Sequence, residues 1–238
     1  MDQYTKNPDD ALNAILLPND YIRRIKNSIN SLNKGEYVVL IDGKKEKEAD
    51  LVLAAKYANE KSIAKFMHLV GTGGSFCVAL TEEQIKKLRL HDEADLMDPD
   101  KPNFTKVVDS YSGTTGINAY DRAMVVSDLV NGMYDNLRVD KGHTFPLRSH
   151  PEGVYGRRGH TEGAVDLTKI ANIDPLGAVI QELMYMGNDE NRWGQVLWGE
   201  GLAKFIEKSK FSYLSIDDII RYRHLKESLT LDFKDDNQ

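Results

Sequence analysis

The 238-residue sequence has a single cysteine, Cys77, only two tryptophans, and no long apolar run. One cysteine cannot form an internal disulfide and makes a cysteine-based metal site implausible, which fits a reducing compartment. No apolar stretch approaches the roughly 18 residues of a membrane-spanning helix. The opening residues, MDQYTKNPDD, lack the apolar core of a signal peptide. These absences predict a cytoplasmic protein that does not associate with membranes.

The chain also lacks a block of basic residues. Its formal net charge is -6 at pH 7 and its pI is about 5.6. Nucleic acids reward clustered Lys and Arg, so the sequence excludes nucleic acid as an expected partner. A hydrophobic content of 41% over 238 residues is enough to bury the core of one domain.

Composition divides the chain into an N-terminal extension at residues 1–18, one domain at residues 19–223 and a C-terminal tail at residues 224–238. The extension is polar, and we expect Leu12, Ile15 and Leu16 to order part of it.

The periodicity of apolar residues predicts an irregular alternation of strands and helices. Strand patterns occur at residues 36–42, 75–81, 145–148, 177–184 and 211–215, and helix patterns at residues 22–32, 81–90, 118–133, 159–173, 199–209 and from Ile216 onward. The acidic segment at residues 91–112 predicts a mobile loop that leads into a short strand. This order favours an α+β fold, with a mixed β-sheet flanked by helices in a single domain, over a regular doubly wound fold.

The segment GRRGHTEG concentrates chemistry in a few residues, Arg157, Arg158, Gly159, His160 and Thr161. The imidazole could bind a metal, while the helix-start amides, the hydroxyl and a guanidinium could cradle an anion. Alternatively, Thr161 caps a helix and the arginines are surface charges. The spacing alone leaves both interpretations open.

The segment DGKKEKEAD places Asp42, Glu46, Glu48 and Asp50 directly after a buried strand. Carboxylate oxygens together with a histidine suit Mg²⁺ or Mn²⁺. The alternative is a charged hairpin turn with no ligand.

Three further residues are candidates for chemistry. His143 in GHTFPLR could act as a general acid or base, or be a structural histidine. Thr114 lies in SGTTGINAYDR, which could hold a phosphate but is also a common turn composition. Glu182 is an acid in an otherwise apolar strand, where burial is costly unless the group is paired or functional.

Taken in order, KEKEAD, FCVALTEE, GTTGINAYDRA, GHTFPLR, RRGHTEGAVDL and IQEL resemble the 3,4-dihydroxy-2-butanone 4-phosphate synthase family of riboflavin biosynthesis. The resemblance runs over residues 19–223. Its most specific parts are GHTFPLR and GHTEGAVDL, because the seventeen-residue step from His143 to His160 also resembles the family's.

The resemblance implies a lyase that converts the phosphosugar ribulose 5-phosphate into 3,4-dihydroxy-2-butanone 4-phosphate and formate. It implies a divalent metal, Mg²⁺ or Mn²⁺, at an active site near a homodimer interface, which segments such as AMVVSDLV could help to form. The implied metal ligands are Glu46 and His160, and the implied catalytic residues are His143, Glu182 and Asp50. The implied substrate contacts are Lys45, Glu46, Asp50, Thr114, Arg157, Arg158, Gly159, His160 and Thr161, with Arg157 and Thr161 gripping the phosphate.

The acidic segment departs from the family pattern, which is a run of acids followed by Arg-Glu-Asn-Glu-Gly-Asp. This chain has Gly43 and Lys44 in the acidic run, and Lys45, Lys47 and Ala49 replace Arg, Asn and Gly. A lysine cannot reproduce a bidentate guanidinium contact. Two other hypotheses therefore stand beside the family reaction: a divergent enzyme with another phosphosugar or product, and a non-catalytic phosphosugar-binding relative.

Overall fold

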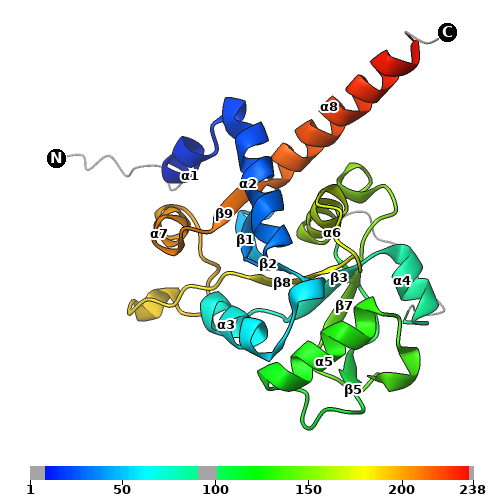
Figure 1. Ribbon diagram of the computed structural model, residues 1–238. Coiled ribbons are helices and arrows are strands. Elements are labelled where there is room, and N and C mark those ends of the chain that lie inside the picture. The colour runs from blue at the N-terminus through cyan, green and yellow to red at the C-terminus, as the bar shows by residue number, and fades with distance from the viewer. Residues whose placement is uncertain (1–8, 91–100, 236–238) are drawn as a thin grey trace.

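The protein folds around a mixed sheet, and the computed structural model describes residues 9–90 and 101–235 (Figure 1). Seven strands form the main sheet in the order β4-β7-β3-β8-β2-β1-β9. Their bounds are β1 (Val38–Asp42), β2 (Glu48–Ala54), β3 (Cys77–Leu80), β4 (Asn103–Phe104), β7 (Phe145–Arg148), β8 (Ala178–Glu182) and β9 (Ser212–Ser215). The pairs β1–β9 and β3–β7 are parallel and the others are antiparallel, so the predicted mixed sheet is confirmed. A separate antiparallel pair joins β5 (Val108–Ser110) to β6 (Leu137–Val139).

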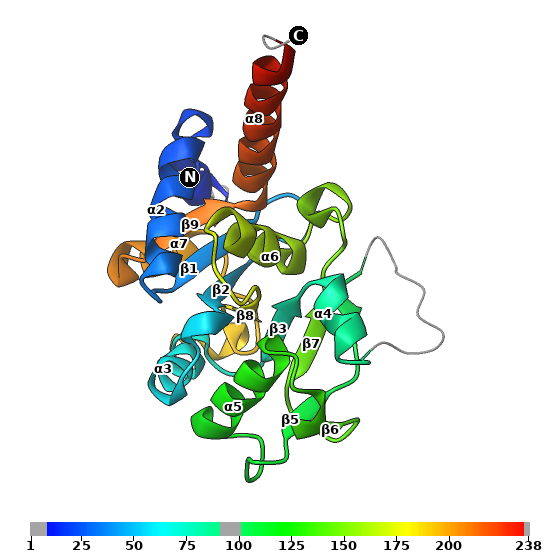
Figure 2. The ribbon, with the colours of Figure 1, turned by 45° about the vertical axis from the view of Figure 1, so that its right-hand side comes forward.

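Helices cover both faces of the sheet (Figures 1 and 2). Those of the described residues are α1 (Asp10–Ile15), α2 (Tyr21–Asn33), α3 (Glu60–Val70), α4 (Glu82–Lys87), α5 (Ala119–Val130), α6 (His160–Ile170), α7 (Glu200–Ser209) and α8 (Ile216–Asp235). Within residues 9–90 and 101–235, none of the helices is both long and apolar enough to cross a membrane.

The alternation of side chains along each strand separates two apolar cores. On β2, Leu51 and Leu53 pack into the core that includes residues of α3 and α5, whereas Val52 and Ala54 pack into the core that includes residues of α2 and α6. Because successive strand residues point to opposite faces, a fully apolar strand must be covered on both sides. The continuous apolar runs in the sequence therefore follow from the layered arrangement.

Local signals at the element ends agree with the sequence. Thr81 and Gln84 form a capping box at the start of α4, and Ser215 Oγ accepts a hydrogen bond from the Asp218 N–H near the start of α8. Of the acidic segment at residues 91–112, residues 91–100 lie outside the described residues, and the remainder contains the two short strands β4 and β5.

Helical segments lie on both sides of residues 18 and 223, which stay the predicted domain bounds. Leu12 of α1 is buried, and Ile15 and Leu16 pack against the same core. At the other end, α8 continues past Arg223 without a break and projects from the body of the molecule (Figure 2).

A buried ion pair joins α2 to the start of α8. Arg24 Nε and Nη2 donate to Asp218 Oδ2 and Oδ1 at 2.7 and 2.8 Å, and both side chains are at most 4% exposed. Arg24 Nη1 also donates to the Leu17 carbonyl at 2.9 Å. The guanidinium thus fixes α2 to α8 and to the segment that follows α1.

We expect Arg24→Met to lower the free energy of unfolding by about 3 to 5 kcal/mol, because it leaves the Asp218 carboxylate buried without its cation. Urea denaturation followed by circular dichroism measures this loss. Arg23→Met is the matched control: its pair with Asp20 is exposed, with 66% and 39% of the side chains accessible, and we expect a change below about 0.5 kcal/mol. Equal losses in the two variants would contradict the assignment.

Candidate active site

Carboxylates gather at the end of the sheet where β2 begins and β8 ends. The register pairs Asp50 of β2 with Glu182 of β8, and paired residues of neighbouring strands point to the same face. The segment before β2 carries Glu46, and Glu48 is the first residue of β2. The start of α6 brings His160 to the same place.

The acidic segment is a hairpin turn between β1 and β2, and Asp42 organises it. The buried Asp42 Oδ1 accepts the backbone N–H groups of Lys44 and Lys45 at 2.9 and 3.1 Å, and it also accepts a hydrogen bond from Arg158 Nη1. Burial alone would raise the pKa of Asp42, but Arg158 and the two amides outweigh it and lower this pKa. The segment DGKKEKEAD therefore forms a hairpin turn, and its carboxylates can still act as metal ligands.

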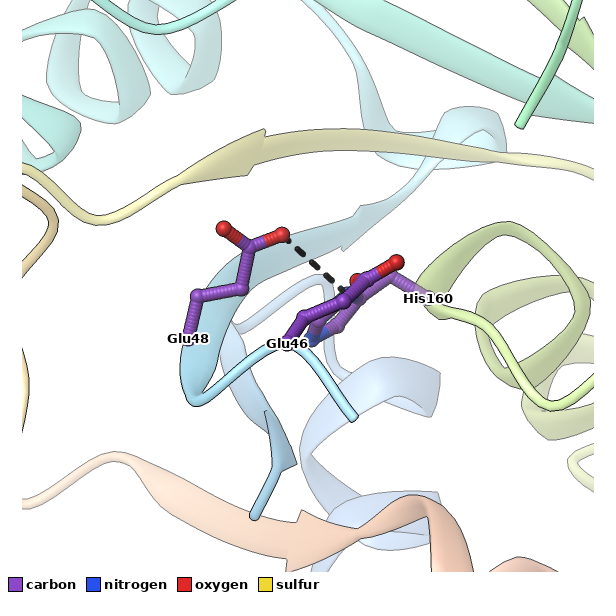
Figure 3. Close-up of side chains that lie close together, drawn as sticks. All are labelled: Glu46, Glu48 and His160. Carbon is purple, nitrogen blue, oxygen red and sulfur yellow. Dashed lines mark hydrogen bonds and ion pairs between the residues drawn. The ribbon is translucent and has the colours of Figure 1, made fainter. Parts of the chain in front are cut away.

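Glu46, Glu48 and His160 point toward one another (Figure 3). His160 Nδ1 lies 3.2 Å from Glu46 Oε2, 3.9 Å from Glu48 Oε1 and 4.0 Å from Asp50 Oδ1. One potential ligand atom from each of Glu46, Glu48 and His160 falls within 4.8 Å of the others. Two buried atoms beside them, His160 Nε2 and Asp50 Oδ1, have no hydrogen-bond partner among the described residues. This donor set of two or three carboxylates and one imidazole is suited to Mg²⁺ or Mn²⁺.

The crowding of acids changes their ionisation. Burial opposes charge on His160, but Asp50 and Glu46 outweigh it and raise its pKa to about 9. Burial, reinforced by Asp50, raises the pKa of Glu48 to about 7. Burial also raises the pKa of Asp50 to about 7, with Glu182 adding to the shift and His160 opposing it. The hydrogen bond with His160 lowers the pKa of Glu46. The pocket is thus held together by a protonated imidazole among acids.

Arg157 forms the cationic wall of the pocket. Its Nη1 donates to Glu162 Oε2 at 2.7 Å, its Nη2 lies 3.9 Å from Glu46 Oε1, and only 3% of the side chain is exposed. Its Nε has no hydrogen-bond partner among the described residues. Gly159 makes this approach possible, because a Cβ there would lie 2.1 Å from Arg157 Nη1. Thr161 follows in the first turn of α6, where free backbone amides favour an anion.

These side chains line one pocket. Opposite the histidine, Glu182 Oε2 accepts the Ser75 N–H at 3.0 Å. The lining residues are Glu46, Glu48, Asp50, Ser75, Cys77, Pro102, Phe104, Leu147, Arg157, His160, Thr161, Ile180, Gln181 and Glu182. The structure therefore brings Glu46, Asp50, Arg157, His160, Thr161 and Glu182 together from distant parts of the sequence.

Five other residues with sequence-predicted roles are not among the lining residues of this pocket. Gly159 is the N-cap residue of α6, between Arg157 and His160. Lys45 is exposed on the turn, and Arg158 faces away, toward Asp42 and Asp217. His143 is 49% exposed, and its Nδ1 lies 2.9 Å from Asp109 Oδ2. Thr114 donates its hydroxyl to Asp121 Oδ2 at 2.7 Å.

The interpretation of the sequence missed two buried acids that contact candidate site residues. Asp109 is 1% exposed, accepts both the backbone N–H and the ring nitrogen of His143, and pairs with Arg138. Glu162 is fully buried beneath Arg157. Glu48 was predicted as one of the carboxylates that could bind a cation, and its spacing from Asp50 places both on one face of a strand. For Asp109 no local pattern signals the partner, which lies 34 residues away.

Comparisons with known proteins agree with this geometry. Residues 26–222 match the model of the family described as 3,4-dihydroxy-2-butanone 4-phosphate synthase. The chain is 35% identical over 210 residues to the 3,4-dihydroxy-2-butanone 4-phosphate synthase of Wigglesworthia glossinidia brevipalpis, covering 85% of this chain and 93% of the relative. It is 34% identical over 211 residues to the riboflavin biosynthesis protein RibBA of Aquifex aeolicus (strain VF5), covering 86% of this chain and 50% of that protein.

The fold agrees as well. A crystal structure of 3,4-dihydroxy-2-butanone 4-phosphate synthase in complex with two magnesium ions matches with a TM-score of 0.74 at 31% sequence identity, covering 85% of this chain and 97% of that chain. The protein thus shares the mixed-sheet fold of an enzyme whose crystal structure contains two magnesium ions. The chain belongs to the 3,4-dihydroxy-2-butanone 4-phosphate synthase family. It spans about half the length of RibBA.

We expect the affinity for Mg²⁺ or Mn²⁺ to rise with pH between pH 6 and pH 9. A cation needs a neutral imidazole, and the metal-free His160, with a pKa of about 9, holds its proton below that pH. This one proton lowers the apparent affinity by up to about tenfold for each pH unit below 9. Calorimetric titration with MnCl₂ across this range measures the effect, and an affinity that does not change with pH would contradict it.

Proposed function

We propose that this protein converts ribulose 5-phosphate into 3,4-dihydroxy-2-butanone 4-phosphate and formate, and that the acidic pocket is its active site. The observation that carries the proposal is the convergence of Glu46, Glu48 and His160 beside a buried Arg157 in a chain of this family. A cation site and a phosphate-binding cation in one pocket are what a phosphosugar substrate requires.

Glu46 and His160 would hold the divalent cation, with Glu48 as a third ligand. The fit rests on the ligand atoms that lie within 4.8 Å of one another and on the buried Asp50 Oδ1, which has no hydrogen-bond partner among the described residues. When bound, the cation supplies Lewis acidity toward neighbouring oxygens of the sugar and so makes the adjacent carbon-bound proton more acidic.

Arg157 and Thr161 would bind the phosphate. The guanidinium is held in place by Glu162, and the first turn of α6 adds amide donors that favour an anion. Binding energy at the phosphate, away from the reacting carbons, positions those carbons against the acids.

Asp50 and Glu182 would move protons. They are register partners on neighbouring strands, and a pKa of about 7 lets Asp50 both accept and return a proton near neutral pH. Asp50 would also contact a substrate hydroxyl. The N–H of Ser75 holds the Glu182 carboxylate toward the pocket.

His143 would reach the active site from a second copy of the chain. It is exposed, outside the pocket and oriented by the buried Asp109, which is the arrangement of a general acid or base that still lacks a substrate.

Large apolar side chains are exposed in the same region: Tyr111, Ile117, Tyr120 and Met133. The segment AMVVSDLV is not available for such an interface as a whole, because Val125, Val126 and Leu129 are buried in the core of this chain. A C2 homodimer that covers the exposed side chains is the assembly we expect.

The altered turn supports a second candidate function, a related reaction on another phosphosugar. Lys45 stands where the family has an arginine, and it is exposed outside the pocket. A substrate that depended on a bidentate contact there would bind less well.

The reaction is tested by incubating the purified protein with ribulose 5-phosphate and Mg²⁺ and measuring formate. We expect formate release from the natural chain and none from Glu46→Ala or His160→Ala, with the circular dichroism spectra unchanged. Arg157→Ala should weaken substrate binding by about 1.5 to 3 kcal/mol, as expected for a charged hydrogen-bond donor. Binding of the substrate without formate release would favour the second candidate, and no binding of any pentose phosphate would exclude both.

The action of His143 across an interface is tested by mixing two inactive variants, Glu46→Ala and His143→Ala. In a heterodimer, one pocket combines an intact Glu46 with an intact His143 of the partner subunit, so random exchange of subunits should restore about a quarter of the natural activity. If His143 acts within its own chain, the mixture stays inactive. Sedimentation velocity of the natural protein, run alongside, reports the dimer.

A further inference from the structure

Asp9, in the segment before α1, bridges Lys47 of the β1–β2 turn and Trp198, which packs against that turn. Its Oδ2 accepts a hydrogen bond from Lys47 Nζ at 2.9 Å, and its Oδ1 accepts one from Trp198 Nε1 at 2.8 Å. These partners lie 38 and 189 residues away in the sequence. One carboxylate thus connects the N-terminal extension, the β1–β2 turn and the segment that leads into α7.

Lys47 separates two pocket acids in the β1–β2 turn. It lies between Glu46 and Glu48, and its φ of 51° is in the left-handed region, which is unfavourable for a residue with a Cβ. A backbone in that region persists only when surrounding contacts hold it. The ion pair with Asp9 is such a contact, because it fixes the far end of the Lys47 side chain.

Trp198 restrains the other side of the same turn. A Cβ on Gly43 would lie 3.9 Å from Trp198 Cη2, so the indole ring lies against the start of the turn. The hydrogen bond from its Nε1 to Asp9 sets the orientation of this ring.

The extension is itself firmly attached, so Asp9 can act as an anchor. Its carbonyl accepts the Asn13 N–H at 2.8 Å in the first turn of α1. Beyond α1, the Leu17 carbonyl accepts from Arg24, and the Ile15 carbonyl accepts from Tyr213 Oη at 3.3 Å.

We propose that Asp9 is a positioning residue for the cation site: by holding Lys47 and Trp198 it keeps the β1–β2 turn in the conformation that directs Glu46 and Glu48 toward His160. This inference rests on the proposed function of the pocket as a divalent-cation site. Asp9 does not touch the ligand atoms, and it acts only through the turn.

The experiment compares Asp9→Asn with the natural full-length protein. Asparagine keeps an acceptor for Trp198 and removes the charge that pairs with Lys47. We expect the dissociation constant for Mn²⁺, measured by calorimetry, to rise about three- to tenfold, a modest effect because the pair is partly exposed. The difference should shrink in 0.5 M KCl, since salt screens exposed ion pairs. Amide hydrogen exchange of residues 43–48, measured without metal, should become faster.

Glu82→Gln is the matched control. The Glu82–Lys86 pair on α4 has the same 2.9 Å separation and 26% exposure of its acid, close to the Asp9–Lys47 pair, but lies outside the pocket. We expect this variant to bind Mn²⁺ as the natural protein does. Lys47→Met should reproduce Asp9→Asn, and the double variant should be no worse than either single one, because all three remove the same interaction.

The outcomes separate the two proposals. If the natural protein binds Mn²⁺ and Asp9→Asn binds it equally well with unchanged exchange at residues 43–48, the positioning role is overturned while the proposed function stands. If the natural protein binds no divalent cation, the proposed function fails, and the positioning of the cation site fails with it. In that case, faster amide hydrogen exchange of residues 43–48 in Asp9→Asn would show that Asp9 supports the turn but has no role in a cation site.

Discussion

The pairing of β2 with β8 is the constraint on which the pocket depends. It sets Asp50 opposite Glu182, and it directs Glu48 to the same face as both. A slip of one residue would turn these carboxylates to the other face of the sheet. Acids placed opposite each other repel, and His160 offsets this repulsion at Asp50. The apolar residues of β2 pack into a core on each side of the sheet. This packing stabilises the register of β2 with β8 against the repulsion between the acids.

The sequence was sufficient to predict the layered architecture because its signals are local. Apolar periodicity, Thr81 and Ser215 as caps, and the apolar runs of β1 and β8 each report on a few neighbouring residues. They agree with one another, and the mixed sheet with flanking helices is what the structure contains.

The pocket could be predicted only in part. From the residues alone, the roles of the segments DGKKEKEAD and GRRGHTEG remained ambiguous. The resemblance to a family predicted that Glu46 lies near His160, although the two are 114 residues apart. The separation of His143 from the pocket, the burial of Asp109 and the contact of Lys47 with Asp9 could not be predicted in the same way. Each depends on how distant segments pack, and a charged side chain gives no local sign of which partner it will meet.

The pair of Arg24 with Asp218 has a consequence for how the molecule unfolds. The same guanidinium binds the carbonyl after α1 and the carboxylate at the start of α8, so the loss of either contact leaves the buried charge of Arg24 with fewer partners. Fraying normally occurs independently at each terminus. Here the segment after α1 and the start of α8 meet at one buried guanidinium, so an opening at one of them removes a partner from the same charge that the other contacts.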